Sequence, residues 1–325
     1  MVPNPAMSAQ NQSGVYLQYN MSGHPIVDAP TVISKAVSGT ILVVFALVGI
    51  PGNLITLLVY VTRGQRHRFR MKSSTLRILG NLTAADLIGS CANIPVCFAL
   101  FLFSSNQNVT QLLSKVHMLI TTPALFINCV CLVLLSLDRH DSLLRANQHR
   151  LRSRKMRFVF AFLWIAALVI GVVGFNSFQG FIVWRPESYL WDSPNSLLLF
   201  VGVIAAISVM ISHVKIKRSF KMNQRVSPEF SGASRLHDAR KLAELRVTRV
   251  MVLITVVLLL TYLPWAACRF LFLAKRRRFH SDVYVICRVM LLTSHVIHPL
   301  LFWSVSSEFR RVTKVLLCQC NRENR

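Results

Sequence analysis

The stretch VLLSLDRHDSLLRANQHRLRSRK, residues 133–155, changes from wholly apolar to strongly basic within a few positions. Asp138 and Arg139 stand side by side at the boundary. Charges at the very end of an apolar segment are typical of a helix that crosses a bilayer, because charges inside the hydrocarbon layer are costly. The stretch therefore predicts a membrane-spanning helix that ends near residue 138.

The composition is that of a membrane protein. Of the 325 residues, 53% are hydrophobic and only 15% are charged, more apolar surface than one soluble core of this length can bury. The formal net charge of +25 falls mainly between apolar runs, so we expect contact with anionic membrane lipids and not with nucleic acid. The sequence contains no nucleophile–base constellation and no metal motif, so we expect no enzymatic activity and no cofactor.

Seven apolar runs are long enough to cross a bilayer as helices. They lie at about 37–61, 75–102, 112–138, 158–178, 195–213, 247–273 and 282–304. The sequence therefore predicts an all-α membrane protein, a seven-transmembrane helix bundle with a short amphipathic eighth helix. We expect an extracellular N-terminal tail at 1–36, the bundle at 37–304, and the amphipathic helix with a short cytoplasmic tail at 305–325.

The basic residues predict the orientation of the bundle. Lys and Arg are concentrated after the first, third and fifth runs, whereas the loops after the second and fourth runs carry almost none. Because basic loops remain in the cytoplasm, we expect the N-terminus outside and the C-terminus inside. The loop KRRRFH at 275–280 is an exception to this rule. Asn11, Asn20 and Asn108 begin sequons on the expected outer side, where we predict glycosylation.

Short motifs occur in successive spans. They are GN at 52–53, NLTAADL at 81–87, DRH at 138–140, Trp164, TYLPW at 261–265 and HPLLF at 298–302. Their order and spacing resemble those of class A (rhodopsin-like) G-protein-coupled receptors over about residues 35–320. The resemblance implies a plasma-membrane receptor that transmits an extracellular ligand signal to heterotrimeric G proteins.

The resemblance assigns part of an activation switch to the end of the third span. Arg139 is expected to be held by Asp138 and by Glu244 on the sixth helix, since a guanidinium can bond carboxylates in pairs. Movement of the sixth helix would release Arg139 toward a G protein. The alternative is that Arg139 only anchors the helix at the lipid phosphates.

The remaining predicted switch residues lie in the sixth and seventh spans. They are Tyr262, Pro264, His298, Pro299 and Phe302. Three of them depart from the family pattern, because Tyr262 stands in place of a Trp, His298 in place of an Asn and Phe302 in place of a Tyr. We expect Pro264 and Pro299, together with Pro95 in the second span, to kink their helices.

Asp86 occupies the position of the family's sodium-binding carboxylate, with Asn53 and Asn128 as further oxygen donors. His298 and His295 are expected to face this carboxylate. Three interpretations remain: a sodium site, a His–Asp pair that responds to pH, or neutral histidines hydrogen-bonded inside the bundle. We favour the third, and His beside the carboxylate argues against sodium.

Cysteine usage also departs from the family. Ser114 stands where the family places the cysteine that tethers the second outer loop, and residues 175–195 contain no cysteine. Cys268–Cys287 is a candidate replacement for that disulfide. Cys318 and Cys320 follow an amphipathic stretch and are predicted palmitoylation sites.

The ligand class is predicted first by exclusion. Leu292 stands where opsins carry the Schiff-base Lys, and Thr121 stands where amine receptors carry an Asp, so we expect neither class. Arg288 and Arg269 lie near the outer ends of the last two spans and favour a small anionic ligand. The predicted ligand-binding residues are Arg288, Arg269, Tyr284, His117, Thr121 and Tyr262. The alternative is that Arg288 pairs with Asp282 or Glu187.

The segments on the expected cytoplasmic side indicate how intracellular partners bind. The basic third inner loop, about 214–246, carries several serines, whereas the tail after the eighth helix is very short. Arrestin should therefore bind weakly or through that loop. A competing interpretation is a non-signalling, receptor-like membrane protein that associates with another receptor, as the departures at Tyr262, His298 and Phe302 would allow. A transporter is disfavoured, because no internal repeat appears.

Overall fold

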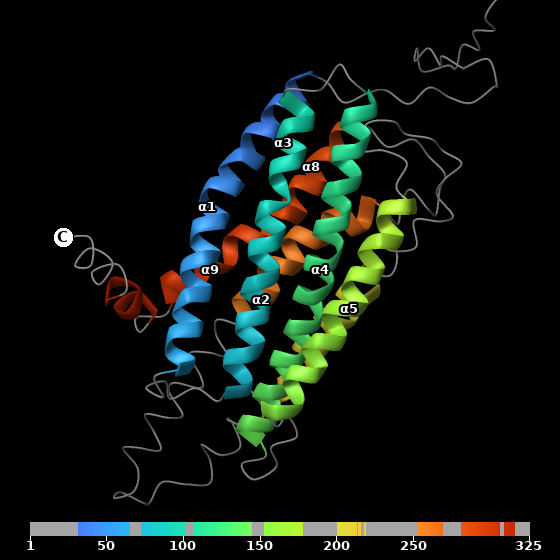
Figure 1. Ribbon diagram of the computed structural model, residues 1–325. Helices are drawn as coiled ribbons and strands as arrows, with labels where there is room; N and C mark the ends of the chain where they lie inside the picture. The colour runs from blue at the N-terminus through green and yellow to red at the C-terminus, as the bar shows by residue number, and fades with distance from the viewer. Residues whose placement is uncertain are drawn as a thin grey trace, which may run out of the picture.

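The computed structural model describes residues 32–65, 73–101, 107–144, 153–177, 200–212, 252–268, 281–305 and 309–315, together with residues 214, 215 and 218. The labelled helices are α1 (Val32–Gln65), α2 (Ser73–Cys91), α3 (Asn93–Phe101), α4 (Gln107–Leu144), α5 (Ser153–Ser177), α8 (Ser281–Leu292) and α9 (Ser294–Val305). Two further apolar helices are Phe200–Ser212 and Val252–Cys268. These helices lie side by side in one bundle (Figure 1).

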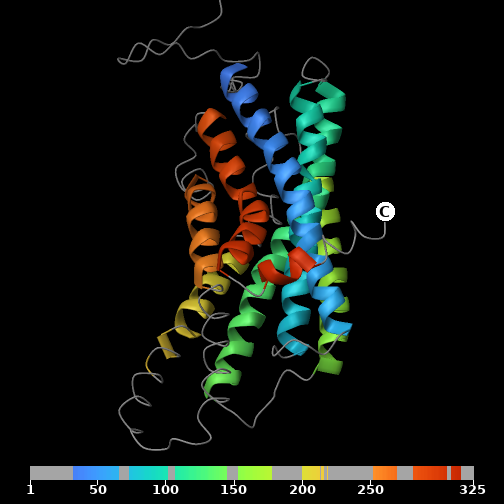
Figure 2. The ribbon, with the colours of Figure 1, turned by 90° about the vertical axis from the view of Figure 1, so that its left-hand side faces the viewer.

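The helices correspond in order to the seven predicted spans. The second span consists of α2 and α3, and the seventh of α8 and α9. The helices Phe200–Ser212 and Val252–Cys268 are the fifth and sixth spans. α4 packs against α2, α3 and α5, and α1 packs against α2, α3 and α9. Figure 2 shows α1 (blue) next to the α8–α9 pair (red), so the first and last spans meet and close the bundle.

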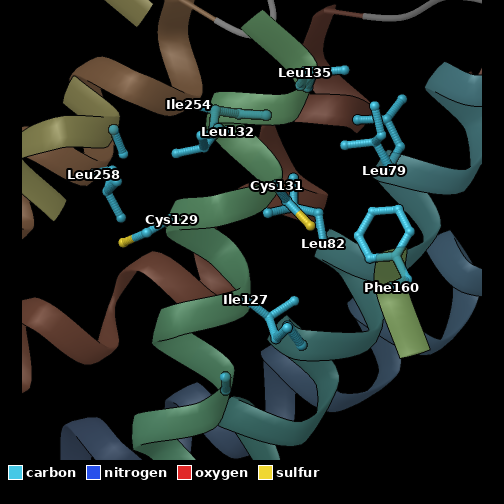
Figure 3. Close-up of a cluster of buried hydrophobic side chains, with 14 of the residues drawn as sticks. Leu79, Leu82, Ile127, Cys129, Cys131, Leu132, Leu135, Phe160, Ile254 and Leu258 are labelled. Carbon is cyan, nitrogen blue, oxygen red and sulfur yellow. The ribbon is translucent and has the colours of Figure 1, made fainter. Parts of the chain in front are cut away.

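Apolar side chains cover both the interior and the exterior of the bundle. In the interior, α4 packs its apolar residues between those of the neighbouring spans (Figure 3), where Leu258 lies on one side and Leu79 and Phe160 on the other. On the exterior, Phe158 and Phe162 of α5 are 77% and 71% exposed. A helix that is apolar on nearly every side fits a lipid environment, because only lipid can cover the outer face.

The second and seventh spans are each interrupted. α2 ends at Cys91, whose carbonyl would require an N–H from Pro95, and proline has none. The seventh span is interrupted at Thr293, where the Val296 N–H donates to the Thr293 carbonyl at 3.0 Å, three residues back. This interruption lies well before Pro299, and the helix Val252–Cys268 continues past Pro264. Proline therefore accompanies a helix interruption in the second span, and the kinks expected at Pro95, Pro264 and Pro299 stay predictions.

A short helical segment, residues 309–315, follows α9. Phe309 and Thr313 are buried, whereas Arg311 and Lys314 are exposed, which is the amphipathic pattern expected of the eighth helix. The Arg310 guanidinium donates to the carbonyls of Trp303 and Ser304 at 2.8 Å each and so caps the end of α9.

Candidate functional site

Asp86 of α2 lies in the interior of the bundle, where it is 1% exposed. Asn128 of α4 donates its amide N–H to Asp86 Oδ1 at 2.7 Å. His295 Nδ1 lies 3.1 Å from the same oxygen, and His298 Nδ1 lies 2.6 Å from Oδ2. Three spans are thus joined at one carboxylate, which we call the Asp86 cluster: Asp86, Asn128, His295 and His298.

The contacts of the Asp86 carboxylate bear on the predicted sodium site. Both carboxylate oxygens, where a cation would bind, already face an imidazole nitrogen within 3.1 Å. Asn53 bonds to other groups: its amide nitrogen donates to the His295 carbonyl at 2.8 Å and to the Ser90 hydroxyl at 3.3 Å. Among the described residues, the amide oxygens of Asn53 and Asn128 are buried and have no hydrogen-bond partner.

The geometry favours neutral histidines in the Asp86 cluster. In the part of the chain that the structure describes, Nε2 of His295 and Nε2 of His298 are buried and have no hydrogen-bond partner. A doubly protonated imidazole would place an N–H donor at each of these atoms, and a buried donor without an acceptor is costly. A neutral ring with its proton on Nδ1 donates to Asp86 and leaves no donor unsatisfied.

The carbonyl of His295 lacks its helical donor and instead links α9 to α1 and α2. Pro299 has no N–H, so the carbonyl of His295, four residues earlier, loses its helical donor. Asn53 Nδ2 donates to this carbonyl at 2.8 Å, and the Ser90 hydroxyl lies 3.4 Å from it. The imidazole of His295 fits because α2 has Gly89 there, where an added Cβ would lie 2.6 Å from three ring atoms.

Asp138, near the other end of α4, is buried and held by the first turn of α2. The Ser74 hydroxyl donates to Oδ1 at 2.8 Å, and the Thr75 hydroxyl donates to Oδ2 at 2.6 Å. The N-terminus of a helix also favours a negative charge nearby. The sequence reasoning missed this pair, although hydroxyl residues at the start of the second span were a visible signal. The side chain of Arg139 and all of Glu244 lie outside the described residues, so their contact stays a prediction.

Thr75→Val should lower the free energy of unfolding by about 1.5 kcal/mol, because a hydrogen bond to a charged group is lost. Thermal unfolding of the purified protein in detergent measures this change. Thr62→Val is the matched control, since the Thr62 hydroxyl donates to the carbonyl of Leu58 within its own helix. Equal losses in the two variants would contradict a specific role for the Thr75–Asp138 hydrogen bond.

Three predicted ligand residues lie toward the end at which α4 begins. Arg288 of α8 is 5% exposed, and its Nη2 donates to the sulfur of Met118 on α4 at 2.8 Å. Next to Met118, the buried His117 places Nδ1 2.8 Å from the carbonyl of Ala92, at the junction of α2 and α3. The Thr121 hydroxyl donates to the His117 carbonyl at 2.6 Å. Arg288 therefore contacts α4 at Met118, which lies between His117 and Thr121 in the chain.

The aromatic switch candidates are packed in separate places. Tyr262 is buried, and its ring centroid lies 5.4 Å from that of Trp265. Gly202 of the fifth span makes room for it, because an added Cβ would lie 2.9 Å from two Tyr262 ring atoms. The Tyr262 hydroxyl has no hydrogen-bond partner among the residues described. Phe302 is buried against Tyr60 of α1 in an edge-to-face contact, with ring centroids 5.9 Å apart.

The other predicted sites are only partly described. Asn108 is exposed in the first turn of α4, as an attachment site for a glycan requires. The Cys268 and Cys287 sulfurs lie 3.3 Å apart as free thiols. Tyr284 belongs to α8, but its side chain is outside the described set. The described residues do not include Asn11, Asn20, Arg269, Cys318 or Cys320.

Comparison with known proteins identifies the family. The model of the 7 transmembrane receptor (rhodopsin family) matches residues 52–302. Among solved structures the chain is similar to squid rhodopsin, with a TM-score of 0.69 and 15% sequence identity over 88% of this chain and 81% of that one; at this identity the likeness shows the fold alone. No curated protein sequence matches the chain. The predicted seven-span bundle and its non-enzymatic class are confirmed, and the chain belongs to the rhodopsin family of seven-transmembrane receptors.

Proposed function

We propose that this receptor detects a small anionic ligand, a carboxylate, a phosphate or an acidic lipid, that binds beside Arg288. The observation that carries the proposal is the position of the Arg288 guanidinium, which is 5% exposed inside the bundle and contacts the Met118 thioether. Membership of the family implies coupling to heterotrimeric G proteins.

The chemistry of Arg288 supports an anion. A guanidinium presents five N–H donors in a planar fork that matches a carboxylate or phosphate. With the N-terminus extracellular, as the basic loops predict, Arg288 lies in the outer half of the bundle. The basic loop KRRRFH at 275–280, on the predicted outer side, would raise the local concentration of anions.

Arg288→Gln should weaken the response to an anionic agonist by about 30-fold or more, since truncating one partner of a buried charge pair costs at least about 2 kcal/mol. The measurement is second-messenger output in cells exposed to a panel of small carboxylates, organic phosphates and acidic lysophospholipids. The variants are compared at matched surface level.

Lys115→Gln is the matched control for this experiment. This substitution removes one positive charge near the same end of α4. The Lys115 ammonium, however, lies on the side of α4 that faces α5, 5.9 Å from the ring centroid of Phe175. This variant should keep the wild-type potency. An agonist with equal potency on wild type and Arg288→Gln would contradict the proposed site. The alternative is that Arg288 only pairs with an acidic residue such as Asp282. It predicts that Asp282→Asn and Arg288→Gln lower the surface level of the receptor alike.

The signalling class is tested without any ligand. Glu244→Ala should raise basal second-messenger output several-fold, because it removes the predicted restraint on Arg139, and Arg139→Ala should lower it. Both variants are read beside the intact chain and mock-transfected cells. Output equal to mock in all three would contradict a signalling role and favour the competing function, a receptor-like partner of another receptor, which pull-down of associated receptors would then identify.

A further inference from the structure

Two thiols meet between the sixth and seventh spans. Cys268 is the last residue of the helix Val252–Cys268, and Cys287 lies in α8. Their sulfurs are 3.3 Å apart, and the residues are 8% and 7% exposed. A disulfide requires a sulfur–sulfur distance of about 2.05 Å. The two sulfurs must therefore approach each other by about 1 Å, which rotation of the two side chains provides.

The surrounding residues hold this pair in place. Cys268 and Cys287 belong to one buried cluster with Leu125, Tyr262, Trp265, Ala266 and Leu291. Packing of this kind fixes the two helices against each other and raises the effective concentration of one thiol at the other. Cys129 and Cys131 differ from this pair, because their side chains point away from α4 in different directions (Figure 3).

We propose that Cys268 and Cys287 form a disulfide by exchange with a small-molecule disulfide. The Cys268 thiolate attacks one sulfur of the oxidant, which expels one small thiol and leaves a mixed disulfide on Cys268. The Cys287 thiolate then attacks the Cys268 sulfur and expels the second small thiol. The two protons of the cysteines pass to the two released thiols, and the two electrons reduce the oxidant.

This bond gives the receptor a covalent link in the same outer region where Ser114 replaces the family's tethering cysteine. It closes the chain between 268 and 287, and closing a chain segment restricts mainly the unfolded state. Arg288 follows Cys287 directly, so the disulfide also fixes the part of α8 that carries the guanidinium. The bond itself depends on neither the ligand nor G-protein coupling.

The test uses the full chain in membranes treated with oxidised glutathione. Free thiols are then blocked with N-ethylmaleimide in denaturant, the protein is digested with trypsin, and the peptides are analysed by mass spectrometry. Cleavage after Arg and Lys places Cys268 in peptide 250–269 and Cys287 in peptide 279–288. We expect these two peptides as one linked species that separates on reduction with the gain of two hydrogens.

Matched variants make the result specific. Cys268→Ser and Cys287→Ser should each abolish the linked species, whereas Cys97→Ser should retain it, because Cys97 lies elsewhere, with its sulfur 3.9 Å from the Gly39 carbonyl of α1. Recovery of both peptides only as maleimide adducts or as glutathione mixed disulfides would overturn the proposal. Linkage of Cys268 to any other cysteine would overturn it as well.

Discussion

Asp86→Ala should lower the free energy of unfolding of this receptor by about 3 kcal/mol. The carboxylate accepts a hydrogen bond from Asn128 and faces the Nδ1 atoms of His295 and His298. Alanine leaves these three groups buried without their acceptor, and a buried polar group that loses its partner bears the full desolvation penalty. The loss should appear as a lower thermal unfolding midpoint of the purified receptor.

The chain provides its own reporter of unfolding. Cys129 and Cys131 are 1% and 0% exposed, so a thiol-reactive dye should label them only when the bundle opens. Asp86→Asn is the control, since its amide oxygen still accepts one hydrogen bond and should retain part of the stability. A double-mutant cycle with His298→Ala should show coupling of about 1 kcal/mol or more. An unfolding midpoint of Asp86→Ala equal to wild type would contradict the central role of the Asp86 cluster.

Gly89→Ala should destabilise the receptor by up to about 3 kcal/mol through overpacking. The added methyl would lie 2.6 Å from three atoms of the His295 imidazole, a distance at which the ring must move. The ring cannot move freely, because its Nδ1 lies 3.1 Å from Asp86 Oδ1. The substitution should therefore also disrupt the Asp86 cluster, although it changes no polar group.

Gly80→Ala is the matched control, with the same exchange in the same helix. An added Cβ at Gly80 meets nothing within 4 Å, so this variant should be neutral or more stable by up to about 1 kcal/mol, the helix preference of alanine over glycine. The two variants are compared in the same thermal unfolding assay. Equal midpoints would contradict the close approach of α2 and α9 at Gly89.

The sequence was sufficient for the fold. Seven apolar runs, each long enough to cross the hydrocarbon layer, predict the spans because the bilayer imposes a length that is visible in a single segment. The motifs from Gly52 to Phe302 then identified the family, which the match over residues 52–302 confirms. Family positions alone led us to expect that His295 and His298 face Asp86, and the distances in the structure agree with this expectation.

Composition and motifs determined the membrane class, the number of spans and the family, because hydrophobic length and local motifs are properties of contiguous residues. Only the tertiary structure decided which side chains meet across spans. Ser74 and Thr75 bind Asp138 from 63 or more residues away, and the Arg288 guanidinium meets Met118 across 170 residues. The Cys268 and Cys287 sulfurs approach to 3.3 Å for the same reason. Such contacts depend on the rotation of each helix about its axis and on where proline or a turn interrupts it, and neither quantity is encoded in one segment alone.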